Sequence, residues 1–360
     1  MAAMSRLLPM MAFSTFAIFL LALLATPTNA LVSDPHAHLA RGHDSIAKRK
    51  RSAAKRAKRC RPKSTSLAPA STTPAYTPTK APTSKPAAAP TSTSSKAPAT
   101  TSAAGGGGGG YVNTGLDPNK KLILAWPNGN YGWEPFKGSK VVGGVYSWSP
   151  NDPTKGSGYP FFPMCWGFNQ KTSFANNIDG SKYKLCFGQN EPNQVGQSDM
   201  SPQDGAKLWK AVMEPARNGG CKLVSPATTS APSGIQWVKD FIKACDGCHI
   251  DIIALHWYDV SADAFKEYVT NFYNAFKKPI IVSEYACQNF NGGAQCSKDQ
   301  TWALHTAMAE WFHKTPWIVG FAPFGYMRDM QGVNSDNQLM TQSGAATDLG
   351  LYYLNGSYMK

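Results

Sequence analysis

The sequence is poor in acidic residues: it has 22 Asp and Glu against 36 Lys and Arg in 360 residues, with a formal net charge of +14. The excess positive charge is confined to the first third of the chain. Residues 1–110 contain 15 of the basic residues and two of the acidic ones, whereas residues 111–360 contain 21 and 20. Because a nucleic-acid-binding domain needs a basic face to neutralise phosphates, the nearly neutral residues 111–360 argue against such a partner.

Long apolar runs are also scarce. The one extended run, Met10–Leu24, is shorter than the about 20 residues of a membrane-spanning helix. It lies between Arg6 and the small-residue sequence Thr28-Asn29-Ala30. This order predicts a secretory signal peptide over residues 1–30, and therefore a secreted mature protein without a membrane span. A single-pass membrane anchor is the alternative.

Two regions of biased composition follow the predicted signal peptide. Residues 31–63 contain four Lys-Arg pairs, which behind a signal peptide indicate a pro-segment removed by processing rather than a nuclear import signal or a heparin site. Residues 64–110 consist mainly of Ser, Thr, Ala and Pro and end in six glycines. Such a segment buries too little apolar surface to offset the entropy of folding. We therefore predict a disordered, O-glycosylated linker of the kind that holds a domain at a cell wall.

Residues 111–360 have the length of one (β/α)8 barrel. Eight short apolar runs predict β-strands: Leu122–Trp126, Val141–Trp148, Phe161–Trp166, Leu185–Gln189, Lys222–Pro226, Ile250–Trp257, Pro279–Glu284 and Ile318–Pro323. Four helical patterns separate the later ones: Ser201–Asn218, Ile235–Ala244, Ala262–Phe276 and Lys298–His313. This alternation favours the α/β class and a (β/α)8 TIM barrel. A doubly wound open sheet is the alternative.

The chain contains eight cysteines, which in a secreted protein predict disulfides. Cys287 and Cys296 flank a Gly-bearing loop and form the best-supported pair. A second pair is expected among the cysteines that stand just before strands, namely Cys221, Cys245 and Cys248. The cysteines within or near strands, Cys165 and Cys186, are assigned to the core. Zinc is the competing interpretation of Cys245-Asp246-Gly247-Cys248, but the sequence offers no second Cys/His pair at ligand spacing, so we predict no metal.

Only six glutamates occur in the chain, and two of them stand where an apolar strand ends. Glu191 comes just after the strand Leu185–Gln189, and Glu284 ends the strand Pro279–Glu284. In a barrel, side chains at the C-terminal ends of the strands face the catalytic mouth, so we expect these two carboxyl groups to meet there. A pair consisting of a protonated acid and an ionised carboxylate is what glycoside hydrolysis requires. The sequence therefore predicts Glu191 and Glu284 as catalytic residues.

Further residues at the strand ends predict a sugar-binding lining. The aromatic members are Trp126, Trp148, Trp166, Trp257, Tyr258 and Tyr285. Their faces can stack on sugar rings, although each alone has packing in the core as its alternative. Asn190 is expected to donate to a sugar 2-hydroxyl, and Gln189 and His256 to complete the polar lining. A role for His256 in a nucleophile–base pair or a metal site is disfavoured, because no Gly-x-Ser-x-Gly motif or His/carboxylate cluster accompanies it.

Three motifs resemble those of clan A glycoside hydrolases: Asn190-Glu191-Pro192, Ala254-Leu255-His256-Trp257-Tyr258 and Ser283-Glu284-Tyr285. Over residues 120–355 the chain is similar to glycoside hydrolase family 128, the group around fungal alkali-sensitive linkage proteins. Its strands near Trp126-Pro127-Asn128, Tyr146-Ser147-Trp148 and residues 162–167 also look like that family's N-terminal strands. The resemblance implies a (β/α)8 barrel that hydrolyses β-1,3-glucan with retention of configuration. It further implies Glu191 as the acid/base and Glu284 as the nucleophile.

Two other functions stay open on the sequence alone. One is a β-glucan-binding cell-wall protein without catalysis, and the other is a clan A hydrolase of a different β-glycan, such as mannan or xylan. In each case we expect a polysaccharide or oligosaccharide partner, no cofactor, no nucleic acid and a monomeric protein. The sequon Asn355-Gly356-Ser357 predicts a glycoprotein.

Overall fold

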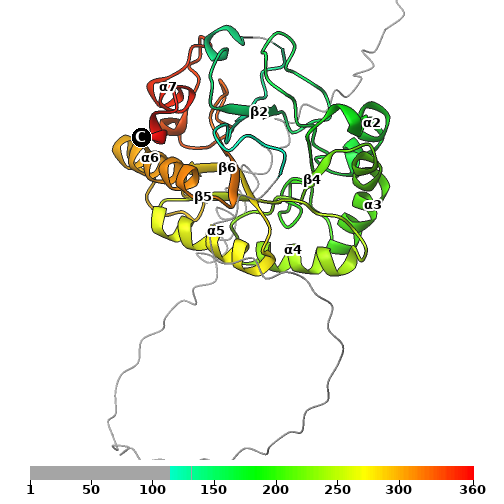
Figure 1. The fold of residues 1–360 in the computed structure, drawn as a ribbon. Helices are drawn as coiled ribbons and strands as arrows, with labels where there is room; N and C mark the ends of the chain where they lie inside the picture. The colour runs from blue at the N-terminus through cyan, green and yellow to red at the C-terminus, as the bar shows by residue number, and fades with distance from the viewer. Residues whose placement is uncertain (1–113, 131) are drawn as a thin grey trace, which may run out of the picture. The chain divides into compact units, whose positions relative to one another are not determined.

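The computed structural model describes residues 114–130 and 132–360. The predicted signal peptide, pro-segment and linker lie outside the described residues. Seven strands form the centre: β1 Leu122–Ala125, β2 Val142–Tyr146, β3 Leu185–Phe187, β4 Lys222–Val224, β5 Ile253–Asp259, β6 Ile280–Cys287 and β7 Ile318–Pro323. Six α-helices accompany them: α2 Lys171–Asn177, α3 Pro202–Asn218, α4 Ser233–Ala244, α5 Ala262–Phe276, α6 Lys298–Lys314 and α7 Asp348–Leu354. The helices lie around the outside of the strands (Figure 1). None of the described helices is long and apolar enough to cross a membrane.

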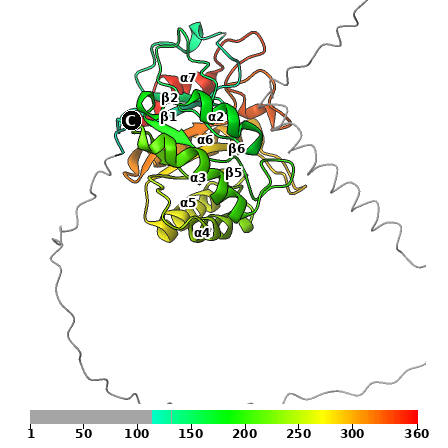
Figure 2. The same ribbon diagram turned by 90° about the vertical axis from the view of Figure 1, so that its right-hand side faces the viewer.

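All strand pairs are parallel. A five-stranded sheet has the order β2-β1-β7-β6-β5, and a two-stranded sheet joins β3 to β4. Isolated parallel bridges lie at the edges of the two-stranded sheet, with Val224 of β4 opposite Ile252, just before β5, and Phe187 of β3 opposite Met164. The predicted α/β class with a parallel sheet is confirmed. In Figure 1, α3, α4 and α5 follow one another around the strands, and Figure 2 shows the same three helices on one side of β5 and β6.

The strand predicted at Phe161–Trp166 is reduced to isolated bridges. Phe161 is bridged to Val145 of β2, and Met164 to Phe187 of β3, so the segment still lies between those two strands. Pro160 and Pro163 have no backbone N–H, which removes donors from the ladder and interrupts a regular strand.

Helix starts follow the sequence signals. The Ser201 side chain accepts from the Asp204 backbone N–H at the N-terminus of α3, and Pro202 occupies the first helical position. At α6, Ser297 and Gln300 form a reciprocal capping box. These caps satisfy N–H groups that the helix itself cannot satisfy, and they fix where the chain turns back toward the next strand.

The core has two parts, one on each face of the strands. In β1, Leu122 and Leu124 join an outer cluster that includes side chains of the helices, whereas Ile123 and Ala125 join an inner cluster. The buried members of the inner cluster all come from strands and loops, and none comes from a described helix. Alternation along each strand thus sends one set of side chains toward the helices and the other toward the inner cluster.

Three disulfides are formed by the described cysteines. Cys287–Cys296 agrees with the prediction, and Cys245–Cys248 supplies the pair expected among the cysteines before strands. Because Cys245 and Cys248 are bonded to each other, neither is a thiolate free to bind zinc. Cys186 lies in the core, as predicted, but it is also bonded to Cys221 and joins β3 to the start of β4, a disulfide that the sequence analysis did not predict. Cys165 is free and buried.

Candidate active site

Glu191 is held in an unusual backbone conformation just after β3. Its φ of 43° lies in the left-handed region, which side chains other than glycine seldom adopt. Its backbone N–H donates to the carbonyl oxygen of Ala227 at 2.7 Å, which ties the loop after β3 to the loop after β4. Trp148, just after β2, has a φ of 52°. Such strain persists only where the surrounding structure fixes it, and it clusters at functional sites.

A β-bulge in β6 places Glu284. In the pairing with β5, Leu255 is opposite Val282 and His256 is opposite Glu284, so Ser283 is an extra residue in β6. The pairing with β7 shows the same shift between Val282 and Tyr285. Val282 faces the outer cluster, and regular alternation would send residue 284 to that side as well. The bulge reverses this alternation and directs the Glu284 side chain inward.

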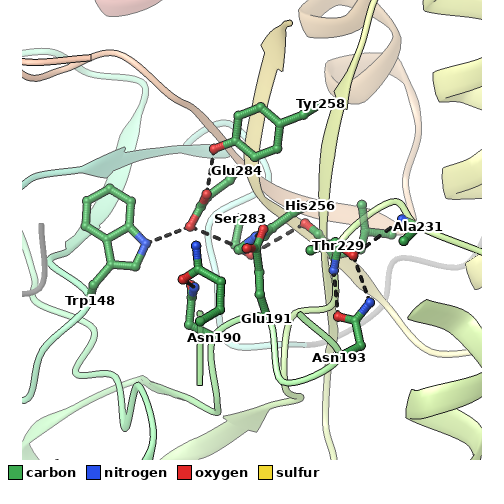
Figure 3. A network of polar contacts seen from close by, with 12 residues as sticks. Trp148, Asn190, Glu191, Asn193, Thr229, Ala231, His256, Tyr258, Ser283 and Glu284 are labelled. Atoms are coloured by element: carbon green, nitrogen blue, oxygen red, sulfur yellow. Dashed lines mark hydrogen bonds and ion pairs between the residues drawn. The ribbon is translucent and has the colours of Figure 1, made fainter. Parts of the chain in front are cut away.

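The two carboxyl groups meet on the inner side of the strands (Figure 3). Trp148 donates from Nε1 to Oε1 of Glu284 at 2.6 Å, and the Tyr258 hydroxyl donates to Oε2 of Glu284 at 2.6 Å. His256 lies between the two glutamates, with Nδ1 2.9 Å from Oε1 of Glu191 and Nε2 3.4 Å from Oε1 of Glu284. Glu191 and Glu284 therefore face one small space from β3 and β6, as predicted from the strand ends.

The separation of the carboxyl groups matches one class of chemistry. A carboxylate oxygen of Glu191, one of Glu284 and a ring nitrogen of His256 all lie within 4.8 Å of one another. Retaining glycosidases hold their two carboxyl groups about 5–5.5 Å apart, whereas inverting enzymes need about 6.5–9.5 Å to admit a water molecule. The observed spacing fits direct attack by one carboxylate on the sugar.

Burial distinguishes the two glutamates electrostatically. Glu191 is 2% exposed, and this burial raises its pKa to about 8, so it carries a proton at neutral pH. Burial raises the pKa of Glu284 too, but His256 and the hydrogen bonds from Tyr258 and Trp148 act against that increase. Glu191 is therefore suited to act as the acid, and Glu284 as the carboxylate.

His256 joins the two groups in a defined protonation pattern. Its burial lowers its pKa, so the imidazole is neutral and one ring nitrogen carries a hydrogen. With Glu191 protonated, its hydroxyl donates to Nδ1, which leaves the hydrogen of the ring on Nε2, 3.4 Å from Oε1 of Glu284 and without a hydrogen-bond partner. The proton of the pair is thus placed on the Glu191 side, and the negative charge on the Glu284 side.

Other predicted lining residues surround the same space. Asn190 is buried, donates from Nδ2 to Oε1 of Gln197 at 3.3 Å, and leaves Oδ1 without a hydrogen-bond partner. Both side-chain polar atoms of Gln189 are also buried and unpaired. Trp166 belongs to the inner cluster, as do Trp148 and Tyr258. Buried, unpaired amides beside a carboxylate pair are groups that a bound polar ligand would satisfy.

Three predicted lining residues lie elsewhere, which corrects the prediction for them. Trp126, Trp257 and Tyr285 belong to the outer cluster. Trp126 stacks on Trp133 with 3.9 Å between ring centroids, and Trp257 stacks on Phe265 of α5 with 4.9 Å. Trp257 and Tyr285 are sequence neighbours of Tyr258 and Glu284, and consecutive side chains in a strand point to opposite faces. Because the sequence analysis assigned neighbouring residues of a motif to the same lining, it included residues whose side chains face the helices.

The structure adds residues that the sequence analysis missed. Tyr146 donates from its hydroxyl to the backbone carbonyl of Ser283 at 2.6 Å, which supports the bulge from the inner side. It stands two residues before Trp148, so the alternation along β2 was a usable signal. Gln170 donates to the carbonyl of Trp148 and accepts from the backbone N–H of Trp166, both at 2.9 Å. Nothing local in the sequence pointed to Gln170.

A second missed contact braces the loop that carries Glu191. Asn193 donates from Nδ2 to Oγ1 of Thr229 at 2.7 Å and accepts from the Thr229 backbone N–H at 3.1 Å (Figure 3). The loop after β3 is thereby fixed to the loop after β4 at a second point, two residues beyond the contact between Glu191 and Ala227.

Among the described residues, Glu191, His256 and Glu284 form the one cluster of His, Cys, Asp or Glu with the spacing of metal ligands. The sequence analysis did not foresee this cluster. However, Trp148 N–H and Tyr258 O–H both point at the Glu284 oxygens. These donors stabilise a carboxylate where a cation would have to approach. The set of neighbours fits a hydrogen-bonded acid pair better than a metal site.

Comparison with known proteins gives a consistent result. Residues 122–353 match the family described as "Glycosyl hydrolase catalytic core". The chain is 24% identical over 239 residues to alkali-sensitive linkage protein 1 of Schizosaccharomyces pombe, which amounts to 65% of this chain and 44% of that protein. The chain thus spans less than half the length of this relative.

Similar solved structures come from glycoside hydrolase family 128, the family that the sequence motifs resemble. An exo-β-1,3-glucanase from Aureobasidium namibiae is 27% identical with a TM-score of 0.58, covering 68% of this chain and 99% of that one. An endo-β-1,3-glucanase from Sorangium cellulosum is 24% identical with a TM-score of 0.56, covering 65% and 97%. An oligosaccharide-binding protein from Trichoderma gamsii shares the fold at 20% identity and a TM-score of 0.57, covering 67% and 95%.

Proposed function

The chain belongs to the glycosyl hydrolase catalytic core family, and from this we propose that it is a retaining glycoside hydrolase that cleaves β-1,3-glucan. The observation that carries the proposal is the buried pair of Glu191 and Glu284, which have carboxyl oxygens within 4.8 Å of each other. Glu284 accepts a hydrogen bond from Tyr258, whereas Glu191 faces Nδ1 of His256. The substrate class is supported by the similarity to family 128 β-1,3-glucanases.

The proposed reaction is a double displacement. In the first step, an oxygen of Glu284 attacks the anomeric carbon while Glu191 gives its proton to the glycosidic oxygen, and the bond from the anomeric carbon to that oxygen breaks. The products are a glycosyl ester on Glu284 and a shortened chain with a new hydroxyl. In the second step, the ionised Glu191 takes a proton from water, and the water oxygen displaces Glu284 from the anomeric carbon.

Neighbouring residues have defined roles in this scheme. Trp148 and Tyr258 orient the Glu284 carboxylate through both of its oxygens, and one of these hydrogen bonds must weaken when that oxygen bonds to carbon. His256 holds the Glu191 hydroxyl until the glycosidic oxygen replaces it as acceptor. Asn190 offers the sugar a buried amide oxygen without a partner. Because Trp148 and Tyr258 already point at the carboxylate, they need little reorganisation during the reaction, and such preorganised donors usually make the largest single contribution to enzymatic rate enhancement.

We infer that the strands close into a (β/α)8 barrel. Isolated bridges place residues 161–164 between β2 and β3, and others place β4 beside β5, so these bridges join the ends of the two sheets. The inner cluster without helix residues supports a ring of strands around its own core. Secretion, a role in cell-wall remodelling, glycosylation at Asn355 and a monomeric state remain predictions from the sequence.

Incubation of the protein with laminarin tests the proposal. We expect new reducing ends, and NMR of the first products should show the β-anomer before mutarotation. Initial release of the α-anomer would refute the retaining mechanism. Parallel reactions with β-1,4-mannan and xylan test the substrate class, because turnover on either without turnover on laminarin would overturn it.

A second candidate function is oligosaccharide binding without catalysis. The similarity to the Trichoderma gamsii protein favours it, since that protein has the same fold and is described as oligosaccharide-binding. Binding of laminarin oligosaccharides by calorimetry, with no reducing-end release over long incubation, would select this function over hydrolysis.

A further inference from the structure

A network of buried hydrogen bonds lies on the outer side of β6. It joins His305, Tyr353, Tyr285 and Asn337 and ends on the residues that follow Glu284. We propose that His305, in α6, is a positioning residue that fixes the orientation of Glu284 without touching the substrate. It acts through the side chain of Tyr285 and the backbone of Cys287. The inference rests on the proposed function, because it assigns a role in the same reaction.

At one end of this network, Asn337 binds the backbone of β6. Asn337 accepts from the Cys287 backbone N–H at 2.7 Å, so its Oδ1 faces the strand. Its Nδ2 donates to the carbonyls of Cys287 at 3.1 Å and Asn334 at 2.9 Å, which uses both amide hydrogens. Nε2 of His305 lies 2.9 Å from the same Oδ1. Because Oδ1 only accepts, Nε2 must carry the hydrogen of the imidazole.

The tautomer of His305 then fixes the direction of the other bonds. With the hydrogen on Nε2, Nδ1 is an acceptor for the hydroxyl of Tyr353 at 2.7 Å, and the same hydroxyl lies 3.3 Å from the backbone carbonyl oxygen of His305, so its hydrogen is directed to His305 in either case. The Tyr353 oxygen can then only accept from the hydroxyl of Tyr285, which lies 2.7 Å away. Each of these side chains, like that of Asn337, is buried and has its hydrogen-bonding groups paired. The hydrogen bonds of this network therefore all run in one direction, and His305 has one tautomer.

This network holds β6 just after the register shift in its pairing with the neighbouring strands. The register shift around Ser283 and Glu284 interrupts regular pairing with β5 and β7. The network of His305 binds two residues that follow this shift, Tyr285 through its side chain and Cys287 through its backbone. A small rotation of this segment would move the Glu284 oxygens away from Trp148 and Tyr258, which they meet at 2.6 Å. A misplacement of 1 Å can cost about 100-fold in rate.

The proposal predicts a specific change in the pH profile. The titratable groups facing Glu284 are Glu191 from the loop after β3, His256 and Tyr258 from β5, and Tyr146 from β2. Of these, Tyr258, together with the Trp148 indole, donates directly to the carboxylate. If Glu284 loses contact with these donors, its pKa rises, and the acidic limb of the kcat/KM profile moves to higher pH. A residue that only stabilises the fold would not shift this limb.

The test uses variants that remove single links of the network. Tyr353→Phe removes the hydroxyl that joins Tyr285 to His305, and His305→Gln retains one donor and one acceptor. Tyr358→Phe is the matched control, because the Tyr358 hydroxyl is buried near the same cluster but has no hydrogen-bond partner. All variants are compared with wild type on laminarin, with activity expressed per mole of folded protein.

For Tyr353→Phe we expect kcat to fall about 10- to 100-fold with KM within about twofold, and the acidic limb to move to higher pH. His305→Gln should retain more activity than His305→Ala, and Tyr358→Phe should match wild type. If wild type turns over laminarin and Tyr353→Phe has wild-type kcat and an unshifted acidic limb, the inference is wrong.

A structural readout separates this inference from the proposed function. If wild type does not hydrolyse laminarin, the proposed function fails, but crystal structures of wild type and Tyr353→Phe still test the positioning role. Displacement of the Glu284 carboxylate from Trp148 and Tyr258 in the variant supports the role, and an unchanged carboxylate overturns it.

Discussion

The sheet at β5 and β6 has a buried histidine on each side, and the two differ in every neighbour. On the inner side, His256 lies between two carboxyl groups, and its Nε2 atom has no hydrogen-bond partner. On the outer side, His305 lies between a tyrosine hydroxyl and an asparagine oxygen, each paired in turn. The same residue type serves a strained, charged site on one side and a neutral, satisfied network on the other.

This difference separates activity from stability. Burying carboxyl groups and leaving polar atoms unpaired costs free energy, which a protein retains only where the groups do chemistry. A fully paired buried network stabilises the fold, and removal of one partner leaves another unsatisfied. Substitutions on the inner side should therefore reduce turnover at little cost to stability. Substitutions on the outer side should cost stability, and only those in the network of His305, Tyr353 and Tyr285 should also reduce turnover, through the position of Glu284.

The largest effect is expected from removing the inner carboxyl groups. Glu284→Gln and Glu191→Gln should each lower kcat on laminarin by roughly 1000-fold or more, because one removes the proposed nucleophile and the other the proposed acid. Stability should be unchanged or higher, since a neutral amide replaces a buried ionisable group. Reducing-end assays and thermal unfolding measure the two quantities. Glu267→Gln on the exposed side of α5 is the control, and turnover like that control in either variant would contradict the assignment.

A smaller loss of activity is expected from removing one donor to the nucleophile. Tyr258→Phe deletes the hydroxyl that bonds to Oε2 of Glu284 and should lower kcat about 100-fold. Loss of this bond raises the pKa of Glu284, so the acidic limb of kcat/KM should move to higher pH. Tyr352→Phe, whose hydroxyl has no hydrogen-bond partner, is the control. A pH profile of Tyr258→Phe that overlays that of wild type would argue against this contact.

The two sides should also respond oppositely to pH. Burial lowers the pKa of His305 from 6.5 to about 4, so between these values the unfolded chain binds the extra proton and stability is lost as pH falls. Burial raises the pKa of Glu191 from 4.5 to about 8, so the folded protein holds the extra proton and stability is lost as pH rises. Between pH 4.5 and 6.5 the two contributions oppose each other.

Removing either ionisable group should reveal the pH dependence that the other contributes to the free energy of unfolding. In Glu191→Gln, the free energy of unfolding should rise with pH over this range more steeply than in wild type, by up to about 1.4 kcal/mol per pH unit. In His305→Gln, the slope should change by a similar amount in the opposite direction. Urea unfolding at several pH values measures both slopes. Equal slopes in wild type and the two variants would show that neither group has the protonation state assigned to it.

The sequence was sufficient for the parts of the site that depend on strand ends. Apolar runs that stop at Glu191 and Glu284 predicted that these carboxyl groups meet, and the resemblance to family 128 is confirmed. The bulge at Ser283 was not predictable, because an extra residue in one strand is visible only against its partners. The Cys186–Cys221 disulfide likewise depends on two strands being adjacent. Gln170 acts through backbone groups, four residues away at Trp166 and 22 residues away at Trp148, and such contacts leave no pattern in the sequence.

The smallest effect on catalysis is expected at Trp257, which precedes Tyr258 but faces the helices. Its ring stacks on Phe265, and Tyr268 lies close by. Trp257→Phe should lower stability by about 1–2 kcal/mol through lost packing, while KM and kcat on laminarin stay within about twofold of wild type. Steady-state kinetics beside urea unfolding checks both values. A several-fold increase in KM would mean that the ring contacts sugar, and it would erase the distinction between the two faces of β5 that separates His256 and Tyr258 from the residue between them.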